Sequence, residues 1–235
     1  MVLISKIRPK HGPEFKIQKD IIAYLLEREW FVRATHGNQY QSGYPDLFAA
    51  KRRYGPRWIE VKNTENFRFT DAQMEVFPQF SKNGVGIWVL QGADHRDYAR
   101  LFGAPNWASF LPVSRVYTRT RHKKPKELIE HRKAGSGPER IIQDKVIEAL
   151  ETAGWFVLET HGSLFQCGFP DLYAVKKGSG QRWIEIKNPD GYTFTGAQLE
   201  TFPRMMAEGI GIWILTSEQQ LDRLDGRPNW MEYLK

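Results

Sequence analysis

The stretch Gly43–Asn63, GYPDLFAAKRRYGPRWIEVKN, recurs almost unchanged at Gly168–Asn188 as GFPDLYAVKKGSGQRWIEIKN. Around it, residues 12–90 match residues 137–215 at a constant shift of 125 (171 minus 46), with about half of the positions identical. All eight tryptophans fall into pairs, and the tripeptide PNW follows each copy. Two long units are too few for a solenoid, so the duplication predicts two homologous domains in tandem.

The duplication divides the chain into a first domain at 1–111, a linker at 112–136 and a second domain at 137–235. The linker has eight Lys or Arg side chains against two Glu, which is +6 of the formal charge of +7 on the chain. A basic connector between near-neutral domains favours contact with a polyanion, although a solvated linker kept soluble by its charge is the alternative. The linker residues expected to bind nucleic acid are Arg119, Arg121, Lys123, Lys124 and Lys126.

Composition excludes several classes of protein. With 41% apolar and 13% aromatic residues, the 235-residue chain can build packed cores, so wholesale disorder is not expected. No apolar run approaches the roughly 20 residues that cross a bilayer, and the stretch MVLISKIRPKHG lacks the apolar centre of a signal peptide. Because Cys167 is the single cysteine, an intramolecular disulfide and a thiolate zinc cluster are excluded. We expect a soluble, intracellular protein, including one that acts in a virus-infected host cell.

The first helix of each repeat carries polar residues on its apolar side. In a helix that begins at Pro13, Glu14 and Gln18 fall on the side of the apolar stripe, and Glu139 and Gln143 do so in the second copy. The stripe consists of Ile17, Ile21 and Leu25. Burying an acid and an amide without partners costs a few kcal/mol, so a metal or a phosphate-bound water is the expected partner. The alternative for Glu14 is a favourable position against the helix dipole.

Two neighbouring strands bring acids and a lysine together. PDLFAAK and RWIEVK form a predicted hairpin around RRYG, and a turn near Tyr54 would place Asp46 opposite Val61 or Lys62. The two-residue period puts Glu60 and Lys62 on one face of the strand and Val61 on the other. Asp46, Glu60 and Lys62 therefore converge at one end of the hairpin. The second copy repeats this set as Asp171, Glu185 and Lys187.

The remaining elements complete the fold prediction. A strand covers WFVRATHG, a second helix starts at Thr70, and GVGIWVL is a buried strand, which gives the order α-β-β-β-α-β with a helical tail. This order is typical of an α/β domain with a central mixed sheet. Thr70 with Gln73, and Thr195 with Gln198, match the capping-box pattern at the start of that helix.

The acids and the lysine favour a particular chemistry. Two carboxylates from neighbouring strands, with a third from a helix, form an oxygen-rich site that suits Mg²⁺ or Mn²⁺ rather than zinc. Such an ion polarises a phosphate and lowers the pKa of a bound water. A lysine on the same face can orient or deprotonate that water and offset the charge on pentacovalent phosphorus. In the alternative reading, Asp46 is a turn residue, and Glu60 and Lys62 lie on an exposed strand face.

The same residues carry a family resemblance. Pro45-Asp46 followed by Glu60-Val61-Lys62 resembles the motif of the PD-(D/E)XK nucleases. The G(Y/F)PDL stretch, the helix acid with its glutamine, and FT-x-A-Q after the lysine are similar to the VRR-NUC branch, to which archaeal Holliday-junction resolvases are related. The resemblance covers about 14–90 and 139–215 and implies two restriction-endonuclease-like domains. Members of this branch usually have a single nuclease domain and act as homodimers or within larger proteins, so the fused pair is a departure from the family. We expect the two domains to form a pseudo-dimer within the chain, with a homodimer of the whole chain as the other arrangement.

The resemblance also implies roles for individual residues. Asp46, Glu60 and the main-chain carbonyl of Val61 would bind the metal, and Lys62 would be the water-activating or transition-state lysine. Glu14 would complete the site, directly or through water, and Gln18 would support it. The equivalents in the second domain are Asp171, Glu185, Ile186, Lys187, Glu139 and Gln143. Gln73 and Gln198 are expected near the site and in contact with nucleic acid, or in a capping role alone.

These expectations lead to three functional hypotheses. The first is a Mg²⁺-dependent endodeoxyribonuclease that makes paired incisions in branched or structured DNA, such as a Holliday junction or a flap. No recognisable base-reading module is present, which favours reading of shape over sequence. The second hypothesis is a double-strand endonuclease of restriction or homing type, and the third is a nucleic-acid-binding protein without catalysis. RNA stays open as a substrate, because acid-plus-metal chemistry does not discriminate the sugar.

Overall fold

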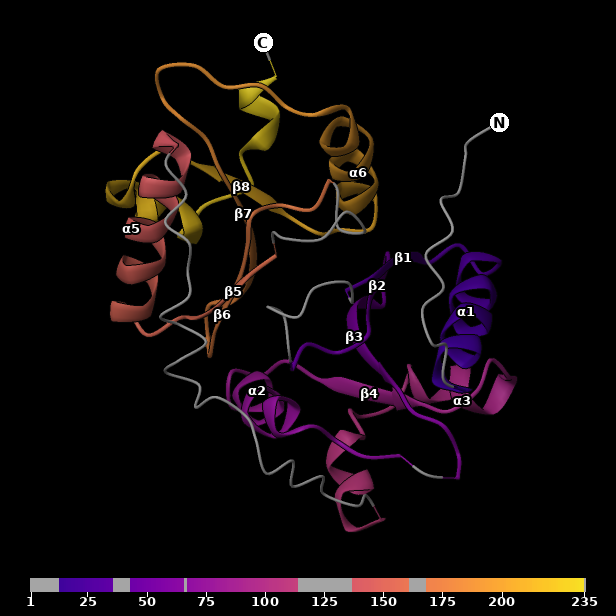
Figure 1. Cartoon of the computed structure of the whole chain (residues 1–235). Coiled ribbons are helices and arrows are strands. Elements are labelled where there is room, and N and C mark those ends of the chain that lie inside the picture. The colour runs from indigo at the N-terminus through magenta and orange to yellow at the C-terminus, as the bar shows by residue number, and fades with distance from the viewer. Residues whose placement is uncertain (1–12, 36–42, 66, 114–136, 161–167, 235) are drawn as a thin grey trace.

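A computed structural model describes residues 13–35, 43–65, 67–113, 137–160 and 168–234. The elements of the first half are α1 (Pro13–Leu26), β1 (Phe31–Ala34), β2 (Leu47–Lys51), β3 (Gly55–Val61), α2 (Asp71–Lys82), β4 (Ile87–Leu90), α3 (His95–Arg100) and η1 (Trp107–Val113). Those of the second half are α5 (Pro138–Thr152), β5 (Phe156–Glu159), β6 (Leu172–Lys176), β7 (Gly180–Ile186), α6 (Gly196–Ala207), β8 (Ile212–Leu215), η3 (Glu218–Asp225) and η4 (Trp230–Tyr233). Figure 1 shows this arrangement, which confirms the predicted order in both halves.

Each half contains a four-stranded mixed sheet, in the orders β1-β2-β3-β4 and β5-β6-β7-β8. The first three strands of each sheet are antiparallel, and the last pairs in parallel with the third. The predicted α/β class with mixed sheets is therefore confirmed. Within the described ranges, no helix is long and apolar enough to span a membrane. The predicted linker begins inside η1, and its basic residues lie outside the described part of the chain.

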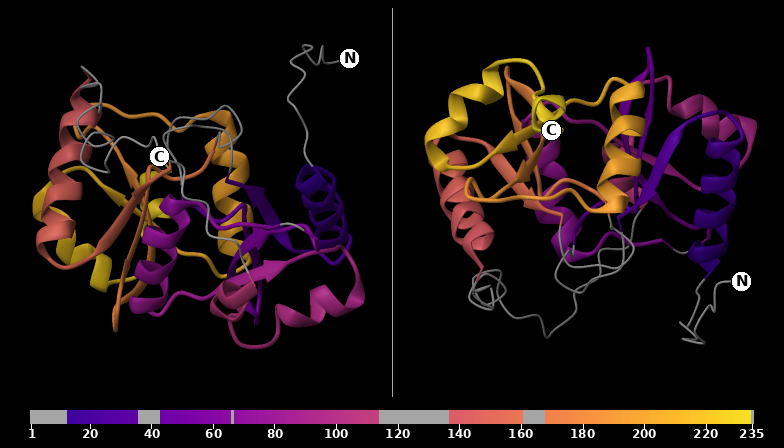
Figure 2. Two further views of the ribbon diagram at one scale, coloured as in Figure 1. Left: turned by 60° about the horizontal axis from the view of Figure 1, so that its bottom comes forward. Right: turned by 90° about the horizontal axis from the view of Figure 1, so that it is seen from above.

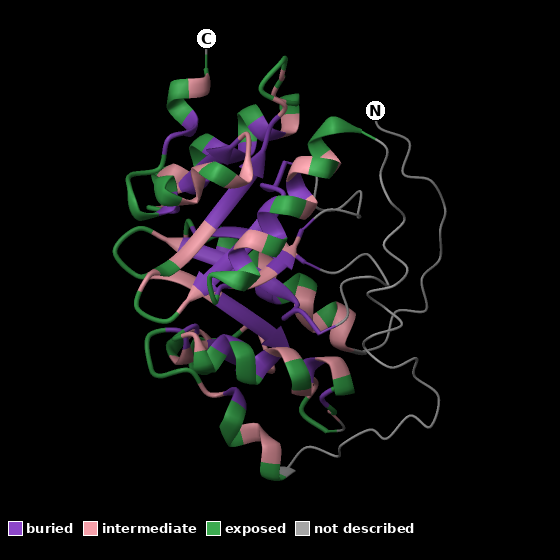
Figure 3. Ribbon diagram, turned by 90° about the vertical axis from the view of Figure 1, so that its left-hand side faces the viewer, coloured by how far each residue is buried: buried purple, intermediate pink, exposed green. Residues whose placement is uncertain are grey.

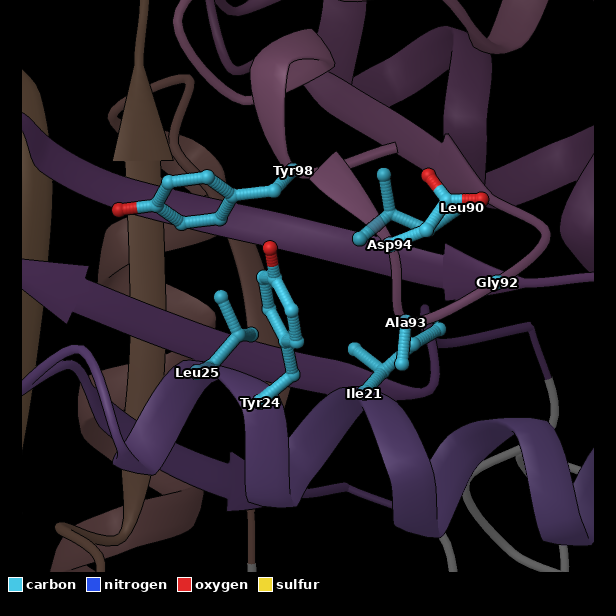
Figure 4. Close-up of a pocket in the computed structure, with 8 residues that line it drawn as sticks. All are labelled: Ile21, Tyr24, Leu25, Leu90, Gly92, Ala93, Asp94 and Tyr98. Carbon is cyan, nitrogen blue, oxygen red and sulfur yellow. The ribbon is translucent and has the colours of Figure 1, made fainter. Parts of the chain in front are cut away.

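The first helix of each half covers one face of its sheet. Ile21 and Leu25 of α1 are buried in one cluster with Leu47 and Ile59 of the hairpin, and Ile17 packs against this cluster, which confirms the predicted stripe. Val146 and Leu150 of α5 and Leu172 and Ile184 of the second hairpin form the matching cluster. Figure 4 shows a small apolar pocket on the α1 side, between α1, the end of β4 and α3.

The hairpin register differs from the predicted one. Leu47 pairs with Ile59 and Lys51 with Gly55, so the turn is centred on Arg53 rather than Tyr54. Continued by one step, this register places Asp46 opposite Glu60, not opposite Val61 or Lys62 as predicted. Two residues of this turn take left-handed conformations, Arg53 with φ of 75° and Gly55 with φ of 74°, and the turn closes one residue earlier than the sequence indicates. A glycine, Gly178, with φ of 89° stands at the position of Arg53 in the second turn.

The PNW tripeptide closes the β4 side of the first sheet. Asn106 accepts a hydrogen bond from the Val89 main-chain N–H at 2.6 Å and donates to the Val89 carbonyl at 3.2 Å, so its amide acts as a strand partner. Trp107 is buried in the core and donates to Ser81 at 2.9 Å. The second copy makes the same asparagine contacts with Ile214. The motif therefore binds each tail to its own sheet.

The other faces of the two sheets contribute to one core. The rings of Trp58 and Trp183, which occupy equivalent positions in the two halves, stack at 6.1 Å and 25°. Phe48 lies 5.0 Å from Trp183, and the equivalent contact joins Tyr173 to Trp58 at 5.1 Å. One cluster of buried residues includes members of both halves. Figure 2 shows the halves side by side, and Figure 3 shows the buried strands at the centre.

Contacts at the hairpin tips are also reciprocal. The main-chain N–H of Arg52 donates to Glu208 Oε2 at 2.6 Å, and that of Lys177 donates to Asn83 Oδ1 at 3.3 Å. Arg52 is equivalent to Lys177, and Asn83 to Glu208, at the shift of 125 residues. Such exchange of equivalent contacts is the property of an interface around a twofold axis.

Candidate active site

Asp46 is held at the start of β2 by main-chain and side-chain hydrogen bonds. Its Oδ2 atom accepts the main-chain N–H of Val61 at 2.6 Å, which ties the start of β2 to the end of β3. Thr35, directly after β1, donates its main-chain N–H to the Asp46 carbonyl at 2.9 Å and its hydroxyl to the Pro45 carbonyl. The carboxylate is therefore buried and oriented before any ligand binds.

Glu60, Lys62 and Gln73 form the centre of the candidate site. Lys62 Nζ lies 2.5 Å from Glu60 Oε1, and the two side chains are 6% and 1% exposed. Gln73 donates its amide to the same Glu60 oxygen at 2.6 Å, and its own oxygen is 3.5 Å from Lys62 Nζ. The strand period thus brings Glu60 and Lys62 to one face, as predicted, and α2 supplies the glutamine that contacts both. The reading of Glu60 and Lys62 as an exposed strand face is wrong.

Gln73 has a second role in the fold. Thr70 and Gln73 form the predicted capping box of α2, in which each side chain accepts the main-chain N–H of the other. Thr195 and Gln198 form the same box at α6. The two readings of this glutamine are therefore compatible: one side chain caps the helix and binds the acid of β3. Contact of Gln73 or Gln198 with nucleic acid stays a prediction.

Charge and burial act in opposite directions on Lys62. Burial lowers the pKa of its ammonium, and the charges of Glu60, Asp46 and Glu14 raise it; the acids prevail, so the pKa lies above the ordinary 10.5. The stabilisation from this pairing is complete below that ordinary value and is lost as the pH rises through the folded-state pKa. Lys62 is therefore a charged, acid-bound ammonium at neutral pH.

The second half repeats these contacts almost atom for atom. Lys187 Nζ lies 2.5 Å from Glu185 Oε1, and Gln198 donates to that oxygen at 2.5 Å. Asp171 Oδ2 accepts the main-chain N–H of Ile186 at 2.6 Å. The two acid–lysine–glutamine clusters have the same construction, so the predicted convergence at the hairpin end occurs twice.

The acids of the first helices take a different position from the one expected of a third ligand. Glu14 Oε1 accepts the main-chain N–H of Asn63 at 3.4 Å, and Glu139 Oε1 accepts that of Asn188 at 3.3 Å. Across the described ranges, no three His, Cys, Asp or Glu side chains are gathered closely enough to hold a metal ion. Each helix acid therefore adjoins the residue after the lysine, and its role as a ligand stays a prediction.

The helix glutamines are not equivalent. Gln143 donates to Glu159 Oε2 at 3.1 Å, and Arg140 donates to the same oxygen at 2.7 Å. The first half has Ala34 where the second has Glu159, so Gln18 has no such acid to bind. The predicted support of the metal site by Gln18 and Gln143 stays a prediction.

Two features of the site were missed in the sequence. The threonine that holds the Pro-Asp carbonyls is identical in the copies, as Thr35 and Thr160, and this identity was the available signal. The contact of Arg140 with Glu159 also had a signal, because both charges replace apolar residues, Phe15 and Ala34, of the first copy.

The donor set fits a divalent cation of the magnesium kind. Asp46 and Glu60 supply two buried carboxylates on adjacent strands, and the Val61 carbonyl lies between the acid and the lysine in the chain. Mg²⁺ is usually bound through one or two carboxylates, together with waters and substrate phosphate, rather than by an all-protein cage. Two acids for each site would therefore be compatible with this ion without a third carboxylate.

Comparison with known proteins gave one structural likeness. No protein-family model matches the chain, and no curated protein matches it. A solved structure described as a VRR_NUC domain is similar to 43% of this chain over 100% of its own length, at 23% identity and a TM-score of 0.31. Functional inference for this chain therefore depends on the geometry of its own two clusters.

Proposed function

We propose that the chain is a divalent-metal-dependent endonuclease with two active sites, one in each half. The observation that carries this proposal is the buried set of two acids, a lysine and a glutamine, which is built twice with the same contacts. A lone structural ion pair needs only Glu60 and Lys62, whereas each half also places a second buried carboxylate, Asp46 or Asp171, beside the pair. Perturbed, buried charges of this kind are typical of functional sites.

The chemistry follows from what each side chain can do. Asp46, Glu60 and the Val61 carbonyl would hold Mg²⁺ or Mn²⁺, which when bound polarises the scissile phosphate and lowers the pKa of water. Lys62 carries a positive charge at neutral pH, so it can hold the attacking water and stabilise the negative charge that develops on phosphorus. Gln73 contacts both the glutamate and the lysine, so that they act from fixed positions.

The proposed substrate is branched or structured DNA. The reciprocal contacts of Trp58 with Trp183 and of the hairpin tips support an internal pseudo-dimer, whose twofold axis would relate the two sites as it relates two strands of a junction. The basic linker would add non-specific affinity for the phosphate backbone. We propose an intracellular location together with this substrate.

Cleavage of a supercoiled plasmid and of a synthetic four-way junction, each with Mg²⁺ and with EDTA, tests the proposal. We expect Mg²⁺-dependent cuts in the junction, paired across its axis, and loss of all cleavage in the double variant Lys62→Ala with Lys187→Ala. Discrete plasmid fragments beside an intact junction would instead indicate a restriction-type enzyme. Binding of DNA without cleavage in any divalent metal would refute catalysis and leave a nucleic-acid-binding protein.

A further inference from the structure

The two halves support each other unequally. Tyr44, in the loop before Asp46, is buried and donates its hydroxyl to the main-chain carbonyl of Glu159 at 2.9 Å, across the boundary between the halves. Glu159 ends β5, and the next residue, Thr160, donates its N–H to the Asp171 carbonyl at 2.9 Å. A side chain of the first half therefore holds the strand end that positions the acid of the second site.

A second contact runs in the same direction. Arg33 of β1 donates to the hydroxyl of Thr201 on α6 at 2.9 Å, and Thr201 is almost fully buried. The same helix begins at the capping box of Gln198, whose amide binds Glu185. Figure 2 shows α6 beside strands of the first half. The first half thus also fixes the helix that supplies the glutamine of the second site.

Neither contact can occur in the opposite direction. The position equivalent to Tyr44 is Phe169, which has no hydroxyl, and the position equivalent to Arg33 is Leu158. The acceptor of Arg33 changes as well, because Val76 stands at the position of Thr201, whereas Ala34 keeps the main-chain carbonyl that Tyr44 binds at Glu159. Phe169 and Leu158 contain no side-chain donor, so the reciprocal bonds are excluded.

Within the second half, the Glu159 side chain also connects β5 to α5. The Glu159 carboxylate binds Arg140 at 2.7 Å and Gln143 at 3.1 Å, so it ties the first two turns of α5 to β5. Arg140 is further paired with Asp144 at 2.9 Å. Between Arg140 and the start of the helix lies Glu139, the helix acid that adjoins the second site. Phe15 and Ala34 cannot form the equivalent ion pair at α1.

We propose that the second site is the preorganised one, with Tyr44, Arg33 and Glu159 as its positioning residues, and that it makes the first of the two incisions. This inference rests on the proposed function and names how the two sites are ordered. Preorganised side chains lower the cost of reaching the transition state, and a misplacement of about 1 Å can cost on the order of 100-fold in rate. A site whose helix and glutamine are fixed from outside should therefore cut faster than its unsupported copy.

Single-turnover cleavage by one-site variants tests the order. Lys187→Ala leaves the first site and Lys62→Ala the second, and we expect the second site to cut about tenfold faster or more. In the Lys62→Ala background, Tyr44→Phe and Glu159→Ala should each slow the chemical step several-fold at unchanged KM, and Glu159→Gln should restore most of the rate. In the Lys187→Ala background the same changes should alter the cleavage rate less than about twofold. The loop before the first site should tolerate Tyr44→Phe, because the equivalent loop of the second copy already contains Phe169. Glu159 contacts α5 of the second half, so its replacement should not affect the first site. Equal rates at the two sites, or equal effects in both backgrounds, would overturn the proposal.

Hydrogen exchange in the full chain provides a readout that does not depend on cleavage. We expect amides of residues 139–146 to exchange more slowly than those of residues 14–21, and Glu159→Ala to raise exchange at the start of α5 but not of α1. If the protein has no nuclease activity but shows this exchange pattern, the proposed function is refuted, while the positioning of the second cluster by Tyr44, Arg33 and Glu159 still holds. If α1 and α5 are equally protected and Glu159→Ala has no effect on exchange, the unequal positioning of the two clusters is refuted.

Discussion

Replacing Lys62 with methionine should destabilise the metal-free protein strongly. The lysine and Glu60 face each other at 2.5 Å and are 6% and 1% exposed, so the pair is shielded from solvent. Removing one partner of a buried ion pair costs about 3–5 kcal/mol, because the remaining charge stays buried. Asp46 and Glu14 act on the same lysine, so the loss should lie toward the upper end of that range. Methionine replaces the aliphatic part of the lysine side chain with one of the same length, which separates the loss of charge from most of the loss of packing.

Urea unfolding in EDTA measures this effect, and Mg²⁺ provides a second arm. A loss of about 3–5 kcal/mol corresponds to a fall of roughly 1–3 M in the midpoint for a protein of this kind. Added Mg²⁺ should raise the midpoint of Lys62→Met more than that of the unchanged protein, because the metal restores positive charge beside the acids.

The matched control is Lys145→Met, whose ion pair with Glu218 at 3.9 Å is 57% and 29% exposed. We expect it to cost less than about 1 kcal/mol, as exposed pairs do. If Lys62→Met costs no more than this control, the buried ion pair does not organise the site. If Mg²⁺ has the same effect on both variants, the metal does not bind beside Lys62.

Three further substitutions test the surroundings of the site. Gly43→Ala should cost about 3 kcal/mol or more, because the added Cβ would lie 2.6 Å from the Ala72 carbonyl oxygen in a backbone with φ of +95°. The control, Gly84→Ala, has φ of +81° and no atom within 4 Å, so it should cost only about 1–2 kcal/mol. Equal losses of stability in urea unfolding would contradict the close approach at Gly43. Asn106→Ala should cost about 2 kcal/mol by the same assay, because both main-chain polar groups of Val89 lose their partner, and a loss near zero would argue against the amide as a strand partner. Arg53→Gly should instead raise the melting temperature by a few degrees, corresponding to about 0.5–1 kcal/mol, by relieving the left-handed backbone; a lower melting temperature would show that the arginine side chain contributes more than the strain costs.

The repeat made most of the fold predictable. Positions where the copies agree, such as Asp46 with Asp171 and Gln73 with Gln198, indicated the elements and the convergence of the site correctly. The hairpin register was wrong by one to two residues, because RRYG alone does not reveal that Arg53 accepts a left-handed conformation; the glycine at the equivalent position, Gly178, was the available signal.

Contacts between the halves could not be predicted from either copy alone. Tyr44 with Glu159 and Arg33 with Thr201 are separated by more than a hundred residues, and each contact occurs once because the other copy has Phe169 and Leu158 in place of the two donors. A periodicity reports the faces of one element, but it contains no information on which element of another domain lies against that face. Differences between the copies were the informative signal for these contacts.

Anomalous diffraction from crystals soaked in Mn²⁺ tests the two-site claim most directly. The account predicts one peak beside Asp46 and Glu60 and another beside Asp171 and Glu185, with the ammonium groups of Lys62 and Lys187 moved off their glutamates. Crystals that bind Mn²⁺ elsewhere, while both lysine–glutamate pairs remain closed at these positions, would contradict it.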